Sequence, residues 1–348
     1  MNKVFIGLDV GRSTVKGVAH FESKDSPEVL STASCIFPTS VAKARPLIFE
    51  SLMSGAQADT VTFDGEDYWT GGTAIVQAMG ADPLGRSDTW ILSKEHDILI
   101  KSAVSRLMAQ GMPYQPENAF VALGVPSRVF RERQDLVAAL RKATAQALAV
   151  NDIEPAVFVH AQPLGVIAAH TLDPDGFTKE DRDIENESYA VVDVGQYTTD
   201  LSAVVRGEPV IEATASCEGM ELISNHLRAH LRTLDLEFPL LDLATLLANP
   251  QLRARGKTHD LKECLDEAIS QVLVPKIISA ITETFNPVLL QSVDTFLIAG
   301  GGAPVVFAAL KRHPKLLHAQ IVEDPRWSIS EGFARLAALM HASSLAEH

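Results

Sequence analysis

The sequence predicts an α/β protein of two domains, and three observations support this prediction. Its 348 residues exceed the roughly 100–200 residues of one domain. Buried strand-like runs alternate with helical stretches along the chain, which is typical of the α/β class. A buried strand that ends in Asp-Val-Gly, followed by a turn and a second strand, occurs in each half, at residues 9–11 and 193–195.

The composition excludes several other classes. A hydrophobic fraction of 46% and a charged fraction of 21% are those of a globular protein, not of a disordered chain or a coiled coil. The formal charge of −14 would repel phosphate backbones, so we expect no direct binding of nucleic acid. We find no secretory signal and no apolar run of membrane-spanning length, and therefore expect a cytoplasmic protein without membrane contact. The three cysteines are widely spaced and are interpreted as free thiols: Cys35, Cys217 and Cys264.

The first half begins with residues 4–11, which are apolar on both faces, as a central strand covered on two sides requires. Residues 15–21 continue as a second strand, so residues 11–14 are predicted to form a hairpin turn. Mixed sequence over 35–80 suggests a small inserted subdomain. The elements expected after it are a helix at 93–110, a strand at 119–126, a helix at 131–149, a strand at 156–160 and a helix at 163–171.

The second half begins after an acidic stretch, residues 173–188, which we interpret as a solvated loop and a domain boundary. Its first strands are predicted at 189–194 and 200–205. The later elements are a helix at 220–232, helical sequence over 260–285 with a kink or break at Pro275, a strand at 295–299 and a helix at 330–345.

The two Asp-Val-Gly turns are the features that suggest chemistry. Glycine allows close approach of a ligand, successive backbone N–H groups can bind an anion, and hydroxyls follow in both turns: Ser13, Thr14, Thr198 and Thr199. A carboxylate beside a phosphate site is explained if Mg²⁺ lies between them and keeps several of its waters. A third glycine turn, Gly300-Gly301-Gly302, follows another buried strand, at the sheet edge where α/β proteins bind ligands. The pattern therefore predicts a nucleotide triphosphate site, although neither a P-loop nor a G-x-G-x-x-G motif is present.

These motifs, in this order, resemble those of the actin-like ATPase superfamily, which includes actin, heat-shock chaperone ATPases and sugar kinases. The resemblance covers nearly the whole chain, in five segments: residues 7–16, 159–165, 191–201, 297–303 and 330–334. It implies a duplicated, ribonuclease H-like two-domain fold with a nucleotide cleft between the domains. Domain I would comprise residues 1–165, with an insertion at about 35–92 and the helix 331–348. Domain II would comprise residues 166–330, with a helical subdomain at about 220–290.

The resemblance also implies roles for individual residues. Asp9 and Asp193 would hold Mg²⁺, largely through water, and Gln162 would orient the attacking water. The family often has a carboxylate at the position of Gln162, whereas actin has glutamine. The residues expected to contact ATP or ADP are Gly11, Ser13, Thr14, Lys16, Gly195, Thr198, Thr199, Glu218, Gly300, Gly301 and Gly302. Lys16 could equally be an exposed strand lysine, and Asp200 could simply cap a turn.

The closest resemblance is to plasmid-segregation actins of the ParM/StbA type. It implies an ATPase that polymerises into filaments and moves DNA through a DNA-bound, ParR-like adaptor. Two alternatives remain open at this stage. One is a small-molecule kinase of the same superfamily, for which no catalytic acid is identified, and the other is a nucleotide-binding scaffold with little turnover. The pair His226 and His230 lacks a third ligand and is not interpreted as a zinc site.

Overall fold

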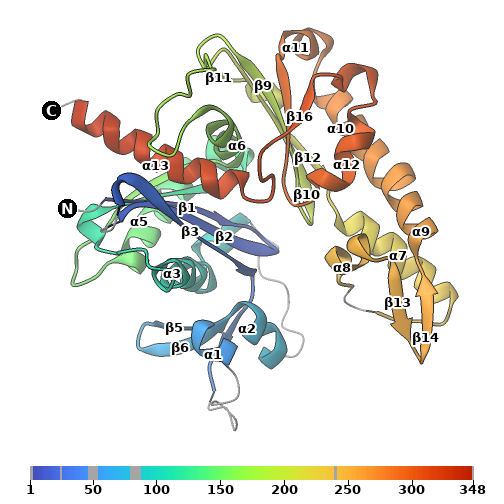
Figure 1. Cartoon of the computed structure of the whole chain (residues 1–348), viewed down its shortest axis with the longest axis horizontal. Coiled ribbons are helices and arrows are strands. Elements are labelled where there is room, and N and C mark those ends of the chain that lie inside the picture. Colours follow the sequence, from blue (N-terminus) through green and yellow to red (C-terminus); the bar gives the residue numbers. More distant parts are fainter. Residues whose placement is uncertain (1–2, 24–25, 46–53, 79–87, 239–240, 347–348) are drawn as a thin grey trace. The chain divides into compact units, whose positions relative to one another are not determined.

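The computed structural model describes residues 3–23, 26–45, 54–78, 88–238 and 241–346 (Figure 1). The chain forms two compact units: unit 1 comprises residues 1–183 and 327–348, and unit 2 comprises residues 184–326. Each unit has its own hydrophobic core.

Unit 1 is built on a five-stranded sheet of order β3-β2-β1-β7-β8. β1 is antiparallel to β2 and parallel to β7, and β7 is parallel to β8. Because all seven residues of β1 are buried, both faces of the sheet must be covered. The strands are β1 (Val4–Val10), β2 (Thr14–Ser23), β3 (Ser26–Pro38), β7 (Ala119–Val125) and β8 (Ala156–Ala161).

Helices cover both faces of this sheet. One face packs against α3 and α5, whose leucines share a core with the even-numbered residues of β1. The other face packs against α6 and α13, and Phe5 contacts His341 of α13 there. The helices of the main body of unit 1 are α3 (Lys94–Met108), α4 (Ser127–Glu132), α5 (Gln134–Leu148), α6 (Gln162–Thr171) and α13 (Ser328–Ala346).

A small subdomain lies between β3 and α3. Its sheet has the order β4-β6-β5, with strands β4 (Val41–Lys43), β5 (Thr60–Phe63) and β6 (Glu66–Thr70). The helices α1 (Ser54–Ala58) and α2 (Gly71–Ala78) complete it, beside β5 and β6 (Figure 1). An ion pair between Arg106 of α3 and Asp59, with 2.5 Å between Nη2 and Oδ1, fastens the subdomain to the main body of unit 1.

Unit 2 repeats the core of this topology. Its sheet follows the path β11-β10-β9-β15-β16, with β12 paired to β10, and β9 is antiparallel to β10 and parallel to β15. The strands are β9 (Ser188–Val194), β10 (Thr198–Val205), β11 (Glu208–Pro209), β12 (Ala215–Glu218), β15 (Thr295–Ala299) and β16 (Ala319–Ile321). A second, two-stranded sheet joins β13 (Gln251–Ala254) and β14 (Lys257–Asp260). The helices are α7 (Glu221–Thr233), α8 (Leu243–Ala248), α9 (Lys262–Glu267), α10 (Val274–Thr284), α11 (Pro287–Ser292) and α12 (Ala303–Leu310).

Two predicted helices are interrupted in the structure. The expected helix at 131–149 is divided at Arg133, whose φ of −129° and ψ of 58° are not helical. The helical sequence over 260–285 is interrupted beside Pro275, as predicted: α9 ends at Glu267, and α10 starts at Val274 with Pro275 in its first turn. The irregularity lies just before it, where residues Ala268–Leu273 form a π-helix.

The units divide at residue 183, within the acidic stretch 173–188 that the sequence analysis interprets as a domain boundary, whereas the family resemblance implied a boundary at 165. Residues 166–183 lie with unit 1 because α6 packs against α13. At their crossing, a Cβ on Gly332 would overlap the carbonyl oxygen of Gly165, so the two helices meet backbone to backbone.

Candidate nucleotide site

The first glycine turn joins β1 to β2 in unit 1. Gly11 N donates to the carbonyl oxygen of Thr14 at 3.1 Å, which closes the turn directly after the buried strand. We call residues 11–14 the phosphate turn. Ser13 and Thr14 are half-buried on it, so their hydroxyls are partly accessible to a ligand.

Lys16 lies beside the phosphate turn and pairs with Asp9. The two residues are directly opposite in the β1–β2 register, and Lys16 Nζ lies 2.6 Å from Asp9 Oδ2. Asp9 is 4% exposed, so its carboxylate is desolvated and the ammonium group compensates its charge. Of the two interpretations of Lys16, the exposed strand lysine is therefore wrong, since its side chain is only 14% exposed.

Gln162 is the first residue of α6 and directly follows β8. Because β1, β7 and β8 are parallel, it lies at the same sheet edge as the phosphate turn. Gly124, near the end of β7, makes room for it: a Cβ there would lie 3.0 Å from Gln162 Cγ and would overlap the ring of Phe333. The Gln162 side chain is half-buried and forms no hydrogen bond within the described residues.

The second glycine turn joins β9 to β10 in unit 2 and has the same construction. Gly195 N donates to the carbonyl oxygen of Thr198 at 2.9 Å, and Asp193 is opposite Asp200 in the register. Gly219 packs directly beneath the turn, since a Cβ there would lie 2.5 Å from the carbonyl oxygen of Gly195. Asp193 is half-buried, at the end of a strand whose other residues are all buried.

The threonines of this second turn have different environments. Thr198 is half-buried, and its hydroxyl donates to Asp200 Oδ2 at 2.9 Å. Thr199 is fully buried, and its hydroxyl donates to the carbonyl oxygen of Glu218 at 3.2 Å. Thr199 thus ties β10 to β12 and offers no group to a ligand in this arrangement. Asp200 accepts hydrogen bonds from Thr198 and Ser216, consistent with a role in shaping the turn.

Glu218 projects into solvent at the end of β12. It forms an ion pair with Lys276 of α10, with 3.3 Å between Nζ and Oε2. Its own backbone N–H and then Lys276 lower the pKa of Glu218 below its usual range. Sequence reasoning did not identify Lys276, because the two residues are far apart in the chain.

The third glycine turn, Gly300–Gly302, joins β15 to α12. Gly300 has a φ of +85°, and a Cβ there would overlap Asp193 Oδ1. A Cβ on Gly302 would lie 2.6 Å from Val194 Cγ1, whereas Gly301 is exposed and faces open space. Gly300 and Gly302 therefore hold the turn against β9, and Gly301 is the residue that leaves room for a ligand.

Thr39 is a further residue at the site that the sequence did not point to. Its hydroxyl donates to the carbonyl oxygen of Gly11 at 2.6 Å, so it contacts the phosphate turn from the end of β3. The one available signal was Pro38, which marks the end of the preceding strand.

The residues fit a magnesium nucleotide in the chemistry of their donors. Asp9 and Asp193 supply hard oxygen ligands of the kind Mg²⁺ prefers. No group of three or more His, Cys, Asp or Glu side chains that could hold a metal occurs among the described residues.

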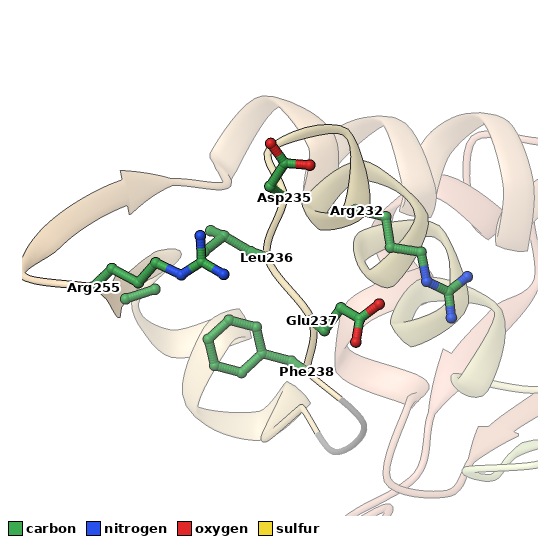
Figure 2. A pocket seen from close by; sticks show the side chains of 7 residues that line it. Arg232, Asp235, Leu236, Glu237, Phe238 and Arg255 are labelled. Carbon is green, nitrogen blue, oxygen red and sulfur yellow. The ribbon is translucent and has the colours of Figure 1, made fainter.

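A hollow of about 570 Å³ lies elsewhere in unit 2, between the end of α7 and the β13–β14 hairpin (Figure 2). It contains none of the predicted site residues, and its lining includes two arginines and two acidic residues. Its lining consists of Arg232, Asp235, Leu236, Glu237, Phe238, Ala254 and Arg255.

Two models of known protein families match this chain. The model of the N-terminal domain of actin-like proteins matches residues 7–165. The C-terminal model of the archaeal actin homologues of the MreB-like type matches residues 191–312. The chain belongs to the actin-like protein family. No curated protein gives a significant match to this actin-like chain.

Solved structures share its fold over nearly the whole chain. Apo pSK41 ParM has a TM-score of 0.70 at 16% identity, with 99% of each chain covered. A 15-stranded ParM filament from Clostridium botulinum has a TM-score of 0.71 at 20% identity, covering 97% of this chain and 99% of the other. The archaeal actin homologue Ta0583 in complex with ADP has a TM-score of 0.67 at 19% identity, covering 96% and 99%. The two-domain α/β actin-like fold expected from the motifs is thereby confirmed.

No helix in the described ranges of this actin-like chain is long and apolar enough to cross a bilayer.

Proposed function

We propose that this actin-like chain binds ATP with Mg²⁺, hydrolyses it, and polymerises into filaments that segregate plasmid or similar DNA. The observation that carries the proposal is the repeated turn. In each unit the second-last residue of a buried strand is an aspartate, and a glycine-closed turn with hydroxyl side chains follows the strand. One such turn is commonplace, whereas two of the same construction in one chain favour a ligand with several phosphates.

The chain's own groups suit such a ligand. Backbone N–H groups of the two turns, with the hydroxyls of Ser13, Thr14 and Thr198, are donors for phosphate oxygens. The Lys16 ammonium is near enough to Asp9 to neutralise it, which keeps that carboxylate from repelling an anion at the phosphate turn. Gly301 leaves an open place for the adenosine or α-phosphate.

Asp9 and Asp193 would face the metal through its water ligands. When bound, Mg²⁺ supplies positive charge that offsets the charge of the phosphates. Gly300 supports this role of Asp193, since its lack of a Cβ allows the carboxylate to lie against the third turn.

Gln162 is the residue we propose for orienting the attacking water. Its amide has both a donor and an acceptor, and no hydrogen bond within the described residues occupies either. Phosphoryl transfer depends mainly on positioning and on stabilisation of charge, so one well-placed amide is a sufficient contribution from a side chain.

Filament formation is supported by the relatives, since one of the similar structures is a ParM filament. With a formal charge of −14, the chain is poorly suited to contact DNA directly. We therefore propose that a DNA-bound adaptor protein, similar to ParR, links the filament to its cargo.

The test is light scattering and phosphate release, followed together on purified full-length chain with ATP and Mg²⁺. The expected result is scattering that rises on addition of ATP and decays as ADP accumulates. Samples with sugars or short carboxylic acids are run in parallel, and phosphate transfer to either would identify a kinase instead. ATP binding without phosphate release or scattering would identify a low-turnover scaffold, and absence of ATP binding would refute the proposal.

A further inference from the structure

Thr39 makes two hydrogen bonds to the phosphate turn. Its hydroxyl donates to the carbonyl oxygen of Gly11 at 2.6 Å, and its N–H donates to the carbonyl oxygen of Ser13 at 3.0 Å. The residue is 9% exposed, so water competes little for either bond. One residue outside the turn thus holds two of the turn's carbonyl groups.

These two hydrogen bonds also fix the direction of the N–H groups of the phosphate turn. The peptide group is planar and trans, so its N–H points opposite to its C=O. Holding the carbonyl of Gly11 towards Thr39 directs the N–H of Arg12 away from Thr39. The carbonyl of Ser13 and the N–H of Thr14 are related in the same way. Thr39 therefore sets the orientation of N–H groups on which an anion-binding turn depends.

Thr39 is also the point where the chain enters the inserted subdomain. Pro38 ends β3, and β4 begins at Val41. The next residue, Ser40, accepts a hydrogen bond through its carbonyl oxygen from the N–H of Gly71, the first residue of α2, at 3.0 Å. Two consecutive residues thus bind the phosphate turn on one side and the base of the subdomain on the other.

The region around this junction has little freedom to absorb a displacement. Gly71 has a φ of +64°, and a Cβ there would lie 3.2 Å from Phe37 Cβ. Arg106 lies over the ring of Phe37 at 4.2 Å and forms the ion pair with Asp59 of the subdomain. A shift of the phosphate turn must therefore move the subdomain or break one of these contacts.

We propose that Thr39 is a positioning residue that orients the phosphate turn for the nucleotide and couples it to the inserted subdomain. The inference rests on the proposed ATP site but goes beyond it, since Thr39 acts through the backbone of the turn. Binding of nucleotide at the phosphate turn would accordingly change how well ordered β4 and the N-terminus of α2 are.

The test compares Thr39→Val with Thr39→Ser. Valine keeps the branched shape and the backbone N–H but removes the hydroxyl, whereas serine keeps the hydroxyl. The matched control is Thr60→Val, since the Thr60 hydroxyl also donates to a backbone carbonyl, that of Ala56, at 2.6 Å in the same unit. The kinetic readout is the KM and kcat of ATP hydrolysis by the full-length chain.

We expect Thr39→Val to raise KM roughly five- to tenfold, because the variant loses one hydrogen bond to the turn, and to change kcat less. Thr39→Ser and Thr60→Val should keep the parental KM. Equal KM values for Thr39→Val and the parent would overturn the proposal. So would an equal rise in Thr60→Val, or a Thr39→Ser variant as weak as Thr39→Val, because either indicates a general packing effect.

Hydrogen exchange of the nucleotide-free chain separates this inference from the proposed function. In Thr39→Val, amides of the phosphate turn and of residues 41–43 should exchange faster together, while in Thr60→Val they should not. If the parent binds no ATP, the proposed function fails, but the coupling is still decided by this exchange. Faster exchange confined to the turn would refute the coupling.

Discussion

The Gln162 side chain combines partial burial with an amide that has no hydrogen-bond partner in the described residues. Replacing it with alanine should leave ATP binding and polymerisation intact, because neither depends on a positioned water. Hydrolysis should slow roughly ten- to a thousandfold, the range expected for one lost positioning group. Phosphate release and light scattering on the same sample measure both effects, and filaments of the variant should outlast those of the parent.

Gln134 provides a matched control, since it is also the first residue of a helix in unit 1. Gln134→Ala should hydrolyse ATP at the parental rate. Parental phosphate release and filament lifetime in Gln162→Ala would mean that Gln162 merely begins a helix. Loss of ATP binding would mean that it is needed for the structure of the site.

Residues of the same motif differ in how well their roles could be predicted from the sequence. Asp9 and Lys16 are both visible in the motif, but only the strand register brings their side chains together. Thr198 and Thr199 look equivalent in the sequence, yet alternation along β10 turns Thr199 into the core. The sequence pattern thus located the turns, but the structure was needed to show which way each side chain points.

The turn between β15 and α12 allows a prediction from two neighbouring glycines. Gly300→Ala should destabilise unit 2 by about 2 kcal/mol, because its φ of +85° disfavours any side chain and the new Cβ would displace Asp193. Gly301→Ala should leave stability within about 0.5 kcal/mol, since its Cβ would meet nothing within 4 Å. Denaturant unfolding followed by far-ultraviolet circular dichroism measures the difference.

The same pair also tests the site. If Gly301 faces the nucleotide, Gly301→Ala should bind ATP more weakly than the parent, although its stability is normal. Parental ATP affinity in Gly301→Ala would exclude that residue from the site, and equal stabilities of the two variants would contradict the geometry of the turn.

Asp97 in the first turn of α3 should make stability depend on pH. Burial, and then the nearby charge of Asp64, raise the pKa of Asp97 to about 6. Asp64 lies in the turn between β5 and β6, and the ammonium groups of Lys94 and Lys101 of α3 lie over the ring of Phe63 beside this turn. Since an unfolded aspartate has a pKa near 4, the folded state binds the proton more tightly, and stability should rise as pH falls from about 7 to 5.

Asp97→Asn removes this titration. At pH 7.5 the variant should be more stable than the parent by about 1 kcal/mol, a figure that allows for solvent screening of the partly exposed Asp97 carboxylate. The difference in stability should shrink towards pH 5. Thermal melts at a series of pH values measure it, with Glu95→Gln of the same helix turn as the control. A pH-independent difference between parent and Asp97→Asn would be inconsistent with the raised pKa.

At the scale of elements, the strands were easier to predict than the helices. Long apolar runs such as residues 4–10 can only be buried strands in a fold of this class. Helix ends depend on local geometry that periodicity does not encode, as at Arg133. The β13–β14 hairpin was missed. In the structure Arg255 and Gly256 both have positive φ, as two-residue hairpin turns often require, but only Gly256 is a turn signal in the sequence.

The molecule as a whole has two hydrophobic cores, one in each unit. If the turns of both units contact one nucleotide, ATP with Mg²⁺ should raise the melting temperature of both. A hundredfold excess over Kd stabilises by about 2.7 kcal/mol, which corresponds to roughly 5–10 °C. Differential scanning calorimetry measures it, with ATP in the presence of excess chelator as the control. A shift confined to one unit would place the site in that unit alone.

The order of the predicted elements located most of the fold, but the division into units depends on contacts distant in sequence. The acidic stretch at 173–188 indicated a boundary near residue 183, but the glycine crossing of α6 and α13 is what assigns residues 166–171 to unit 1. Such a contact joins Gly165 to Gly332 and is invisible to any local pattern.

That crossing also has a consequence for biosynthesis. The helix α13 covers β1 and α6 of unit 1, yet the ribosome makes it only after all of residues 184–326. At roughly 5–20 residues per second, the part of the unit 1 sheet that α13 covers stays exposed for on the order of 10–30 seconds. During that interval the exposed part of the sheet is accessible to molecular chaperones. Unit 2 emerges and folds before unit 1 receives its last helix, α13.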